Sequence, residues 1–379
     1  MRNSFRFLFA TIPFLLSACN GNHTSGEREK GDTLHLSYAK NLTIVKYKGY
    51  TEVEMVDPWH KGKILHTYIL TNKNSEETHF KNSEKSTIIS VPLNKCVVST
   101  SIHSELAYKL GKGNAVAGVF DSQYINSQFI RERVKNGKTT DCGNSMSPNA
   151  EKIASLSPDA ILLSPIQNTG GYGKLETLGT PIIELADYME PTALGRAEWI
   201  KFYGILWGAE KKANDIFEHT EKEYKRLKAI AKKSHNKPLV VMDKAENGVW
   251  YVPGGRSTMG QMIYDANAIY AYAIDKSAGS LQKAPESVID QNSKATVWFI
   301  RYYKPGKAPL TMKELLAENS GYAFIRAFKE KNIYGCNTAT STFFEDVPFE
   351  PHLLLNDLIT AIHPELMSSG KTTYFHLLK

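Results

Sequence analysis

The chain has 379 residues, of which 42% are hydrophobic and 22% charged, and its formal net charge is +7 at pH 7. This length and apolar content predict about two globular domains with real cores. The positive charge is spread over many lysines that acids balance, which argues against a nucleic-acid-binding protein. After the first twenty residues, no stretch is apolar enough to cross a bilayer.

Residues 1–18 are predicted to be a signal peptide. A short positive segment precedes the apolar run 7–16, which is too short to span a membrane as a helix. Leu16-Ser17-Ala18-Cys19 then resembles the lipobox of bacterial lipoproteins, which implies cleavage before Cys19 and attachment of lipid to it. An ordinary secretory signal with an incidental cysteine is the alternative. Residues 19–30, rich in Gly, Ser, Asn and charge, are then a flexible tether to a membrane.

The next segment, residues 31–92, is predicted to be a β-rich extension of the domain that follows it. Leu42–Tyr47 and Ile64–Leu70 alternate apolar and polar side chains, as antiparallel strands do, and turn residues 57–62 separate them.

From residue 93 onward, short apolar runs alternate with helical segments, first over 93–209 and again over 236–379. This alternation predicts βαβ units with parallel strands. The segment between them, residues 210–235, is predicted to be one rigid helix, which from about Glu210 to Ser234 is roughly 37 Å long at 1.5 Å per residue. Its predicted apolar stripe consists of Ala213, Ile216, Phe217, Tyr224, Leu227 and Ala231. The sequence therefore predicts two α/β lobes bridged by a helix.

A helix-to-strand pattern occurs twice, in residues 148–163 and 285–299. Each copy has a glutamate at the start of the helix, Glu151 or Glu286. An ungapped alignment on these glutamates pairs Ile153 with Val288, Ala160 with Ala295 and Leu162 with Val297. The pattern suggests that each lobe presents one carboxylate in an equivalent place. Chance is the alternative, because helix-loop-strand units resemble one another.

Cysteine and histidine spacing predicts no preformed metal site. Cys96, Cys142 and Cys336 remain after Cys19, an odd number that allows at most one disulfide. No pair of histidines has the spacing of zinc ligands.

The order and spacing of several segments resemble the substrate-binding lipoproteins of ABC importers for ferric siderophores, haem and cobalamin. These segments are 93–111, 147–161, 178–183, 195–202 and 355–364. The resemblance implies two Rossmann-like lobes joined by one long helix, with the ligand held between them. It also implies a monomer in the bacterial cell envelope that faces the periplasm and reaches the membrane through lipid only.

The same resemblance assigns a role to the two repeated glutamates. In that family a surface glutamate on each lobe docks into arginine pockets of the dimeric membrane permease, and the corresponding positions here are Glu151 and Glu286. Well-separated charge pairs suit reversible docking. The alternative for either residue alone is an acid that is favourable in the first turn of a helix.

Candidate ligand-binding residues lie just after predicted strands, because ligand sites in two-lobed α/β proteins form at the carboxyl ends of strands. They are His103, Tyr124, Met146, Trp250, Tyr251, Arg256, Arg301, Tyr302 and Tyr303. Aromatic walls suit a planar macrocycle or a catecholate, arginines suit an anionic chelate, and tyrosine or His103 can ligate iron. Packing in the core or at the rim is the alternative for the aromatic residues. The Gly254–Ser257 turn either binds an anion or only starts a helix.

No catalytic constellation is visible. The sequence has no Gly-x-Ser-x-Gly elbow, no Walker loop and no dinucleotide-binding glycine motif after a strand. We therefore expect a binding protein without an intrinsic cofactor rather than an enzyme. Its ligand is expected to be an iron chelate, haem or cobalamin, with an iron complex favoured. A cobalamin importer component, a surface haem scavenger and a chelatase-like enzyme are the alternatives.

Overall fold

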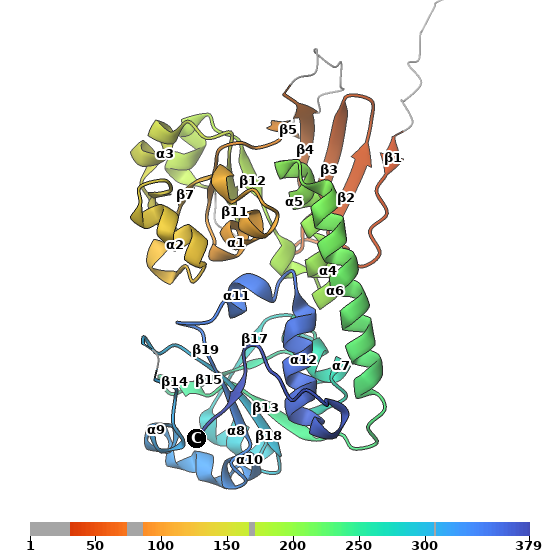
Figure 1. Cartoon of the computed structure of the whole chain (residues 1–379), viewed down its shortest axis with the longest axis vertical. Helices are drawn as coiled ribbons and strands as arrows, with labels where there is room; N and C mark the ends of the chain where they lie inside the picture. The colour runs from red at the N-terminus through yellow and green to blue at the C-terminus, as the bar shows by residue number, and fades with distance from the viewer. Residues whose placement is uncertain (1–30, 74–85, 167–170, 307) are drawn as a thin grey trace, which may run out of the picture. The chain divides into compact units, whose positions relative to one another are not determined.

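Two five-stranded sheets, one parallel and one mainly parallel, organise the protein (Figure 1). The structure is a computed structural model that describes residues 31–73, 86–166, 171–306 and 308–379. The predicted signal peptide, the lipid anchor Cys19 and the tether lie outside these described residues. Within them, no helix has both the length and the apolar character needed to span a bilayer.

The first sheet forms lobe 1 and has the order β12-β11-β6-β7-β8, with all neighbours parallel. Its strands are β6 (Cys96–Val98), β7 (Val116–Val119), β8 (Thr140–Asp141), β11 (Ala160–Leu163) and β12 (Ile182–Glu184). The helices of lobe 1 are α1 (Ser101–Lys109), α2 (Gln128–Lys135), α3 (Ala150–Leu156), α4 (Ala193–Glu198) and α5 (Ile200–Trp207). A small hairpin, β9 (Gly143–Asn144) and β10 (Ser147–Pro148), precedes α3.

The second sheet forms lobe 2 and has the order β16-β13-β18-β19-β20. Its strands are β13 (Leu239–Met242), β16 (Ile269–Tyr270), β18 (Val297–Tyr302), β19 (Ile333–Asn337) and the antiparallel edge strand β20 (His376–Leu377). A second, antiparallel sheet contains β14 (Ala245–Glu246), β15 (Val249–Pro253) and β17 (Ser280–Lys283). The helices are α7 (Thr258–Asp265), α8 (Pro285–Gln291), α9 (Met312–Glu318), α10 (Arg326–Lys329), α11 (Phe343–Asp346) and α12 (Pro351–Ile362).

The two lobes repeat one topology. Without the edge strand β8, the parallel strands of lobe 1 are, in chain order, β6, β7, β11 and β12, and they lie in the spatial order second, first, third, fourth. The parallel strands β13, β16, β18 and β19 of lobe 2 lie in the same order. The two helix-to-strand repeats are therefore equivalent, because α3 and α8 lead into β11 and β18, and each of these strands pairs with the first strand of its sheet. The residue pairs matched in the sequence are also all buried, at 0–2% exposure.

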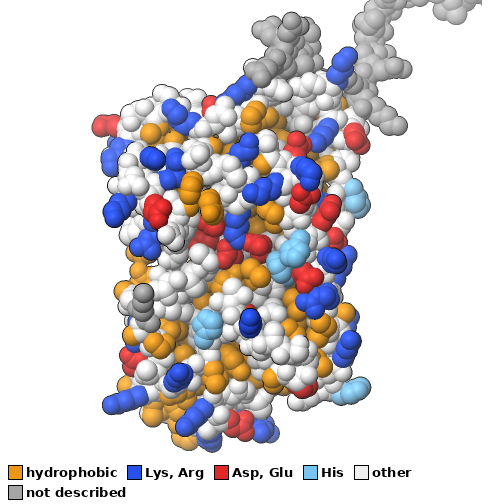
Figure 2. Space-filling view, in the orientation of Figure 1, with side chains coloured by type: hydrophobic (Ala, Val, Ile, Leu, Met, Phe, Trp, Pro, Cys, Tyr) orange, Lys and Arg blue, Asp and Glu red, His pale blue; other side chains and the backbone are white. Residues whose placement is uncertain are grey.

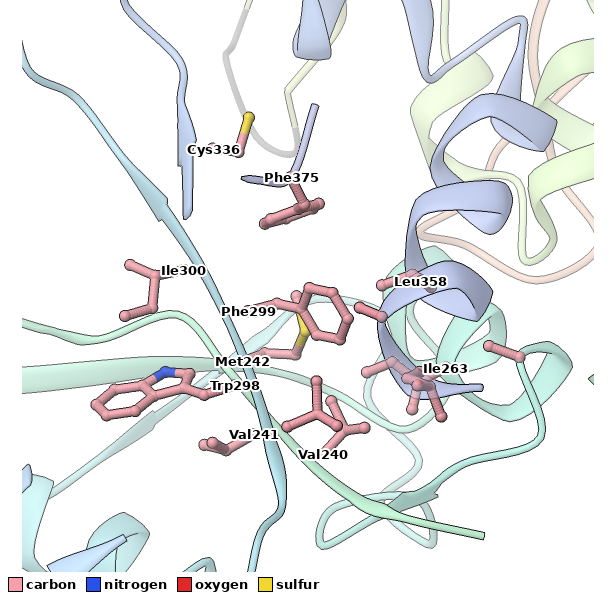
Figure 3. Close-up of a cluster of buried hydrophobic side chains, with 14 of the residues drawn as sticks. Val240, Val241, Met242, Ile263, Trp298, Phe299, Ile300, Cys336, Leu358 and Phe375 are labelled. Carbon is pink, nitrogen blue, oxygen red and sulfur yellow. The ribbon is translucent and has the colours of Figure 1, made fainter. Parts of the chain in front are cut away.

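The core of lobe 2 shows why its strands are apolar throughout. Phe299 points toward Leu358 of α12, whereas its neighbours Trp298 and Ile300 point to the opposite side of the sheet (Figure 3). All three β18 side chains are fully buried. A parallel sheet covered on both faces requires such a continuous apolar run. The predicted fold class, two Rossmann-like lobes joined by a long helix with an extra β-rich N-terminal segment, is confirmed.

Helix α6 (Glu210–Ala231) joins the lobes through one continuous buried stripe. Ala213 and Phe217 belong to the core of lobe 1, whereas Tyr224, Leu227 and Ala231 belong to the core of lobe 2. Thr220 fills the position between them and donates its hydroxyl hydrogen bond to the carbonyl of Phe349, at 3.4 Å. The predicted Ile216 is only partly buried, because the 3-4 spacing of the stripe passes through residue 220 instead.

The N-terminal segment forms a sheet of its own, in the order β1-β2-β3-β4-β5. Its strands are β1 (Asp32–Thr33), β2 (Leu42–Lys46), β3 (Tyr50–Val56), β4 (Ile64–Asn72) and β5 (Ser86–Val91). The first four are antiparallel, as the sequence predicts, whereas β5 runs parallel to β4. Its buried residues share one apolar core with lobe 1.

Two buried carboxylates attach this N-terminal sheet to lobe 1. The Glu198 carboxylate, fully buried, accepts hydrogen bonds from the backbone N–H groups of Ser37, Tyr38 and Ala39 at 2.7–3.0 Å. Glu190 accepts in the same way from the N–H groups of residues 40 and 41. Burial alone raises the pKa of Glu198, but these N–H donors and Lys201 lower it more strongly, so the net pKa is lowered and the side chain is ionised.

Replacing Glu198 with alanine is expected to lower the free energy of unfolding by about 3 kcal/mol, because one buried and two partly buried hydrogen bonds from backbone N–H groups to a charged acceptor are lost. Urea unfolding followed by circular dichroism measures this loss. Glu218→Ala, an exposed site on α6, is the control and is expected to change stability by less than about 0.5 kcal/mol. Equal stability of the two variants would contradict this role of Glu198.

Candidate functional site

Loops at the carboxyl ends of the strands expose large apolar side chains in both lobes. In lobe 1 these are Tyr124, which ends the short turn after β7, Met146 at the tip of the β9–β10 hairpin and Ile166 after β11, at 61%, 83% and 58% exposure. In lobe 2 they are Tyr251 on β15, Tyr303 after β18 and Phe344 on α11. Of these, Tyr251, Tyr303 and Phe344 line one cavity, and exposed apolar side chains that lie together mark a binding surface.

The two lobes meet at this surface. The rings of Tyr124 and Tyr303 contact edge to face across it, with centroids 6.4 Å apart. Nearby, the side-chain amide of Asn126 donates hydrogen bonds to the carbonyls of Thr338 and Ser341, at 2.9 Å each. Loops of lobe 1 and lobe 2 therefore form one candidate ligand cleft.

Two adjoining cavities lie on the lobe 2 side of the cleft. The first, about 280 Å³, is lined by Asp243, Lys244, Glu246, Tyr251, Ser280, Arg301, Tyr302, Tyr303, Thr338 and Phe344. The second, about 500 Å³, shares Lys244, Glu246, Tyr302 and Tyr303 with it and adds Lys304, Glu314 and Glu318. These volumes suit a small-molecule ligand. The structure thus brings together four residues that the sequence selected: Tyr251, Arg301, Tyr302 and Tyr303.

Arg301 in this cavity is held by Asp243. Its guanidinium donates to both carboxylate oxygens, with Nε at 2.9 Å and Nη2 at 2.5 Å. Asp243 has a left-handed backbone, with φ of 59°, and its carbonyl accepts the indole N–H of Trp298 at 2.6 Å. A non-glycine residue in this conformation is often found at a functional site. Asp243 is not among the residues predicted from the sequence, although it directly follows β13 at the strand end where ligand residues are expected.

Two predicted ligand residues are buried and need correction. His103 is 1% exposed; its Nδ1 lies 2.8 Å from the Thr100 hydroxyl and its Nε2 lies 3.5 Å from Asp187. Trp250 is 0% exposed and donates its indole N–H to the carbonyl of Met242 at 2.9 Å. Both side chains point into the protein interior, so the structure argues against either as a ligand contact. Strand-end position alone cannot reveal which face a side chain takes.

The remaining predicted cation, Arg256, is exposed but lines neither cavity. In its turn, the N–H groups of Gly254, Arg256 and Ser257 all donate to backbone carbonyls. The Ser257 hydroxyl accepts from the N–H of Gly260 and so caps α7. Because three of its four N–H groups already donate to carbonyls, this turn serves mainly to start a helix.

A group of acidic side chains surrounds one lysine where α1 and α11 meet (Figure 2). Lys109 of α1 forms ion pairs with Asp346, at 2.7 Å, and with Glu350. Glu105 of α1 is buried beside them, and burial, together with the charges of Asp346 and Glu350, raises its pKa. Glu345 of α11 is also buried, and burial raises its pKa. These contacts hold the lobes together beside the cleft.

The described residues do not support a metal site or a reactive thiol. No group of three or more His, Cys, Asp or Glu side chains there is placed to hold a metal ion. Cys96, Cys142 and Cys336 are free and buried, and burial raises the pKa of Cys96 to about 12 and the pKa values of the other two to about 11. The thiols are therefore protonated at neutral pH.

Glu151 and Glu286 occupy equivalent, accessible places. Each is the second residue of its helix, α3 or α8, and each is exposed. Neither carboxylate forms an ion pair or a hydrogen bond with a residue that the structure describes. Both are consequently free to meet a partner.

A family model described as periplasmic binding protein matches residues 97–340, more than half of the chain. The chain belongs to the periplasmic binding protein family. A lipoprotein of Methanocaldococcus jannaschii is 26% identical over 92% of this chain and 86% of its own length. The iron-uptake system-binding protein of Bacillus subtilis is 22% identical over 69% of this chain and 80% of its own length.

The fold of this periplasmic binding protein is also found in solved structures. A periplasmic heme binding protein from Pseudomonas aeruginosa aligns with a TM-score of 0.59 and 18% identity, over 76% of this chain and 98% of that one. The resemblance to importer-associated binding lipoproteins, seen first in the sequence, is confirmed. Members of this family are generally binding proteins rather than enzymes.

Glu105 makes the junction between the lobes sensitive to pH. Because its pKa is raised in the folded protein, its contribution to stability is fully present below its unfolded value of about 4.3 and is lost as the pH rises through the folded pKa. Glu105→Gln is therefore expected to raise the melting temperature at pH 8, and the gain is expected to disappear near pH 4. Thermal unfolding between pH 4 and 8 tests this. If the stability that the variant gains over the unmodified protein were smaller at pH 8 than at pH 4, a raised pKa of Glu105 would be excluded.

Proposed function

We propose that this protein captures an iron complex, a ferric siderophore or haem, between its two lobes and delivers it to the permease of an ABC importer. The observation that carries the proposal is the joint cleft, in which Tyr124 of lobe 1 meets Tyr303 of lobe 2 beside cavities lined by further aromatic residues. The names of two similar proteins, one an iron-uptake system-binding protein and one a heme binding protein, support this ligand class.

In this proposal, aromatic side chains supply most of the contacts with the ligand. Tyr124, Tyr251, Tyr303 and Phe344 offer partly exposed rings that can pack on the flat faces of a chelate or a macrocycle. Tyr302 is largely buried, and its hydroxyl accepts the N–H of Leu310 at 3.1 Å, so it shapes the cavity wall. Met146 and Ile166 enlarge the apolar surface on the lobe 1 side.

The proposal also places the protein at the cell envelope. Lipid on Cys19 would anchor it outside the cytoplasm, and residues 19–30 would let a monomeric body reach its permease. We further propose the domain boundaries that the sequence suggests: an extension at 31–92, lobe 1 at 93–209, the connecting helix at 210–235 and lobe 2 at 236–379.

Docking is assigned to Glu151 and Glu286. Their helices lead into equivalent strands of two lobes with one topology, so the two carboxylates are related as the halves of a dimeric permease would be. Exposed, unpaired carboxylates on rigid elements can pair with arginines reversibly, because they stay hydrated until the partner binds.

The double variant Glu151→Ala, Glu286→Ala is expected to abolish stimulation of ATP hydrolysis by the cognate importer reconstituted in vesicles, while chelate affinity stays unchanged. The matched control is Glu132→Ala, Glu330→Ala, which removes one exposed carboxylate from each lobe elsewhere. If the docking variant still stimulated ATP hydrolysis fully, the permease would bind another surface of the protein.

Tyr303→Ala is expected to weaken binding of the chelate about tenfold, or about 1.4 kcal/mol, because one aromatic wall of the cleft is lost. Tyr264→Ala removes a similarly exposed tyrosine on α7, away from both cavities, and serves as the control. Quenching of tryptophan fluorescence by haem and by ferric siderophores measures both affinities. Equal affinity of the two variants would place the ligand outside this cleft.

A further inference from the structure

The charges of the candidate cleft are already paired within the protein. The two cavities are lined by three cations, Lys244, Arg301 and Lys304, and by four carboxylates, Asp243, Glu246, Glu314 and Glu318. Each cation contacts a carboxylate: Arg301 with Asp243 at 2.5 Å, Lys244 with Glu318 at 2.8 Å and Lys304 with Glu314 at 2.7 Å. Glu246 is left exposed without an ion-pair partner among the described residues.

The lobe 1 loops add negative charge rather than positive. Asp121 follows β7 and accepts from neutral donors, the Asn144 amide at 3.0 Å and the N–H of Ser145 at 3.1 Å. Asp141 accepts from the Ser122 hydroxyl and from the N–H of Gly143. Lys152 reaches this region, but its ammonium donates to the carbonyl of Asp141.

The Arg301–Asp243 pair is the hardest of these to open. Its two-point geometry fixes both groups, and the side chains are only 28% and 13% exposed. If Arg301 turned toward an anionic ligand, Asp243 would keep a partly buried charge without a partner, which is strongly unfavourable. An anion in this cleft would therefore face uncompensated carboxylates or would have to break an ion pair.

We infer that the ligand of this cleft is a metal chelate without net negative charge. This inference rests on the proposed function and narrows its ligand class. Three hydroxamates, each singly charged, neutralise Fe³⁺, whereas three doubly charged catecholates leave a trianion, and haem carries two propionates. A neutral or cationic ferric hydroxamate fits the paired charges, and the aromatic rings supply its contacts.

Affinities of the full chain for a neutral ferric tris-hydroxamate, a trianionic ferric tris-catecholate, haem and a corrinoid test this inference by fluorescence titration. The hydroxamate is expected to bind at least tenfold more tightly than the catecholate. Tighter or equal binding of the catecholate or of haem would overturn the charge inference and leave the proposed function standing. If none of the three iron complexes binds below about 10 μM, or about −7 kcal/mol, the proposed function fails and the inference with it, even if the corrinoid binds.

Asp243→Asn supplies a second test because it frees Arg301 from its ion pair. Asparagine tolerates the left-handed backbone of this position, so the fold is expected to survive. The variant is expected to bind the tris-catecholate at least tenfold more tightly than the unmodified protein does. Glu330→Gln, which breaks the exposed pair with Arg326 outside the cleft, is the matched control and is expected to leave that affinity unchanged. An equal gain in both variants, or no gain in either, would contradict a role for the cleft pair.

Discussion

The packing of both lobes on one helix is the constraint on which the rest of the structure depends. The buried stripe of α6 enters the core of lobe 1 at Phe217 and the core of lobe 2 at Tyr224 and Leu227. A rigid helix whose apolar stripe is buried in both lobes fixes the separation and the orientation of the two sheets, because neither half of the stripe can leave its core without exposing apolar surface. The carboxyl-end loops of two separate sheets can then share one cleft.

Within that frame, polar contacts set the finer arrangement of the lobes. Asn126 and Lys109 of lobe 1 reach backbone carbonyls and carboxylates of lobe 2, close to α11. Burial raises the pKa values of Glu105 and Glu345 near Lys109, and a raised pKa lowers the cost of burying a carboxyl group beside other acids. Charge is also balanced within the cleft, where Arg301 pairs with Asp243 and is not available to a ligand.

Several residues predicted from the sequence line one cavity, whereas others are buried, and this difference has one cause. Tyr251, Tyr302 and Tyr303 follow or occupy strands, and the structure places them at one cavity. His103 and Trp250 satisfy the same sequence rule, yet both point inward, because a position near a strand end does not specify the direction of the side chain. Asp243 and Phe344 were not predicted, because aspartate is common in turns and phenylalanine is common in helices. Only the residues that surround them in space indicate that they belong to the cleft.

The sequence by itself determined the local elements, the repeat around Glu151 and Glu286 and the long helix, because these depend on periodicity and spacing along the chain. The family came from the resemblance of several segments to known binding proteins. The tertiary structure decided which residues meet. It matched Tyr124 with Tyr303, used Thr220 rather than Ile216 in the stripe of α6, attached the N-terminal sheet through Glu198, and paired Arg301 with Asp243. Such contacts join residues that are distant in the chain, so their energies depend on the packing of whole elements and leave no pattern in the local sequence.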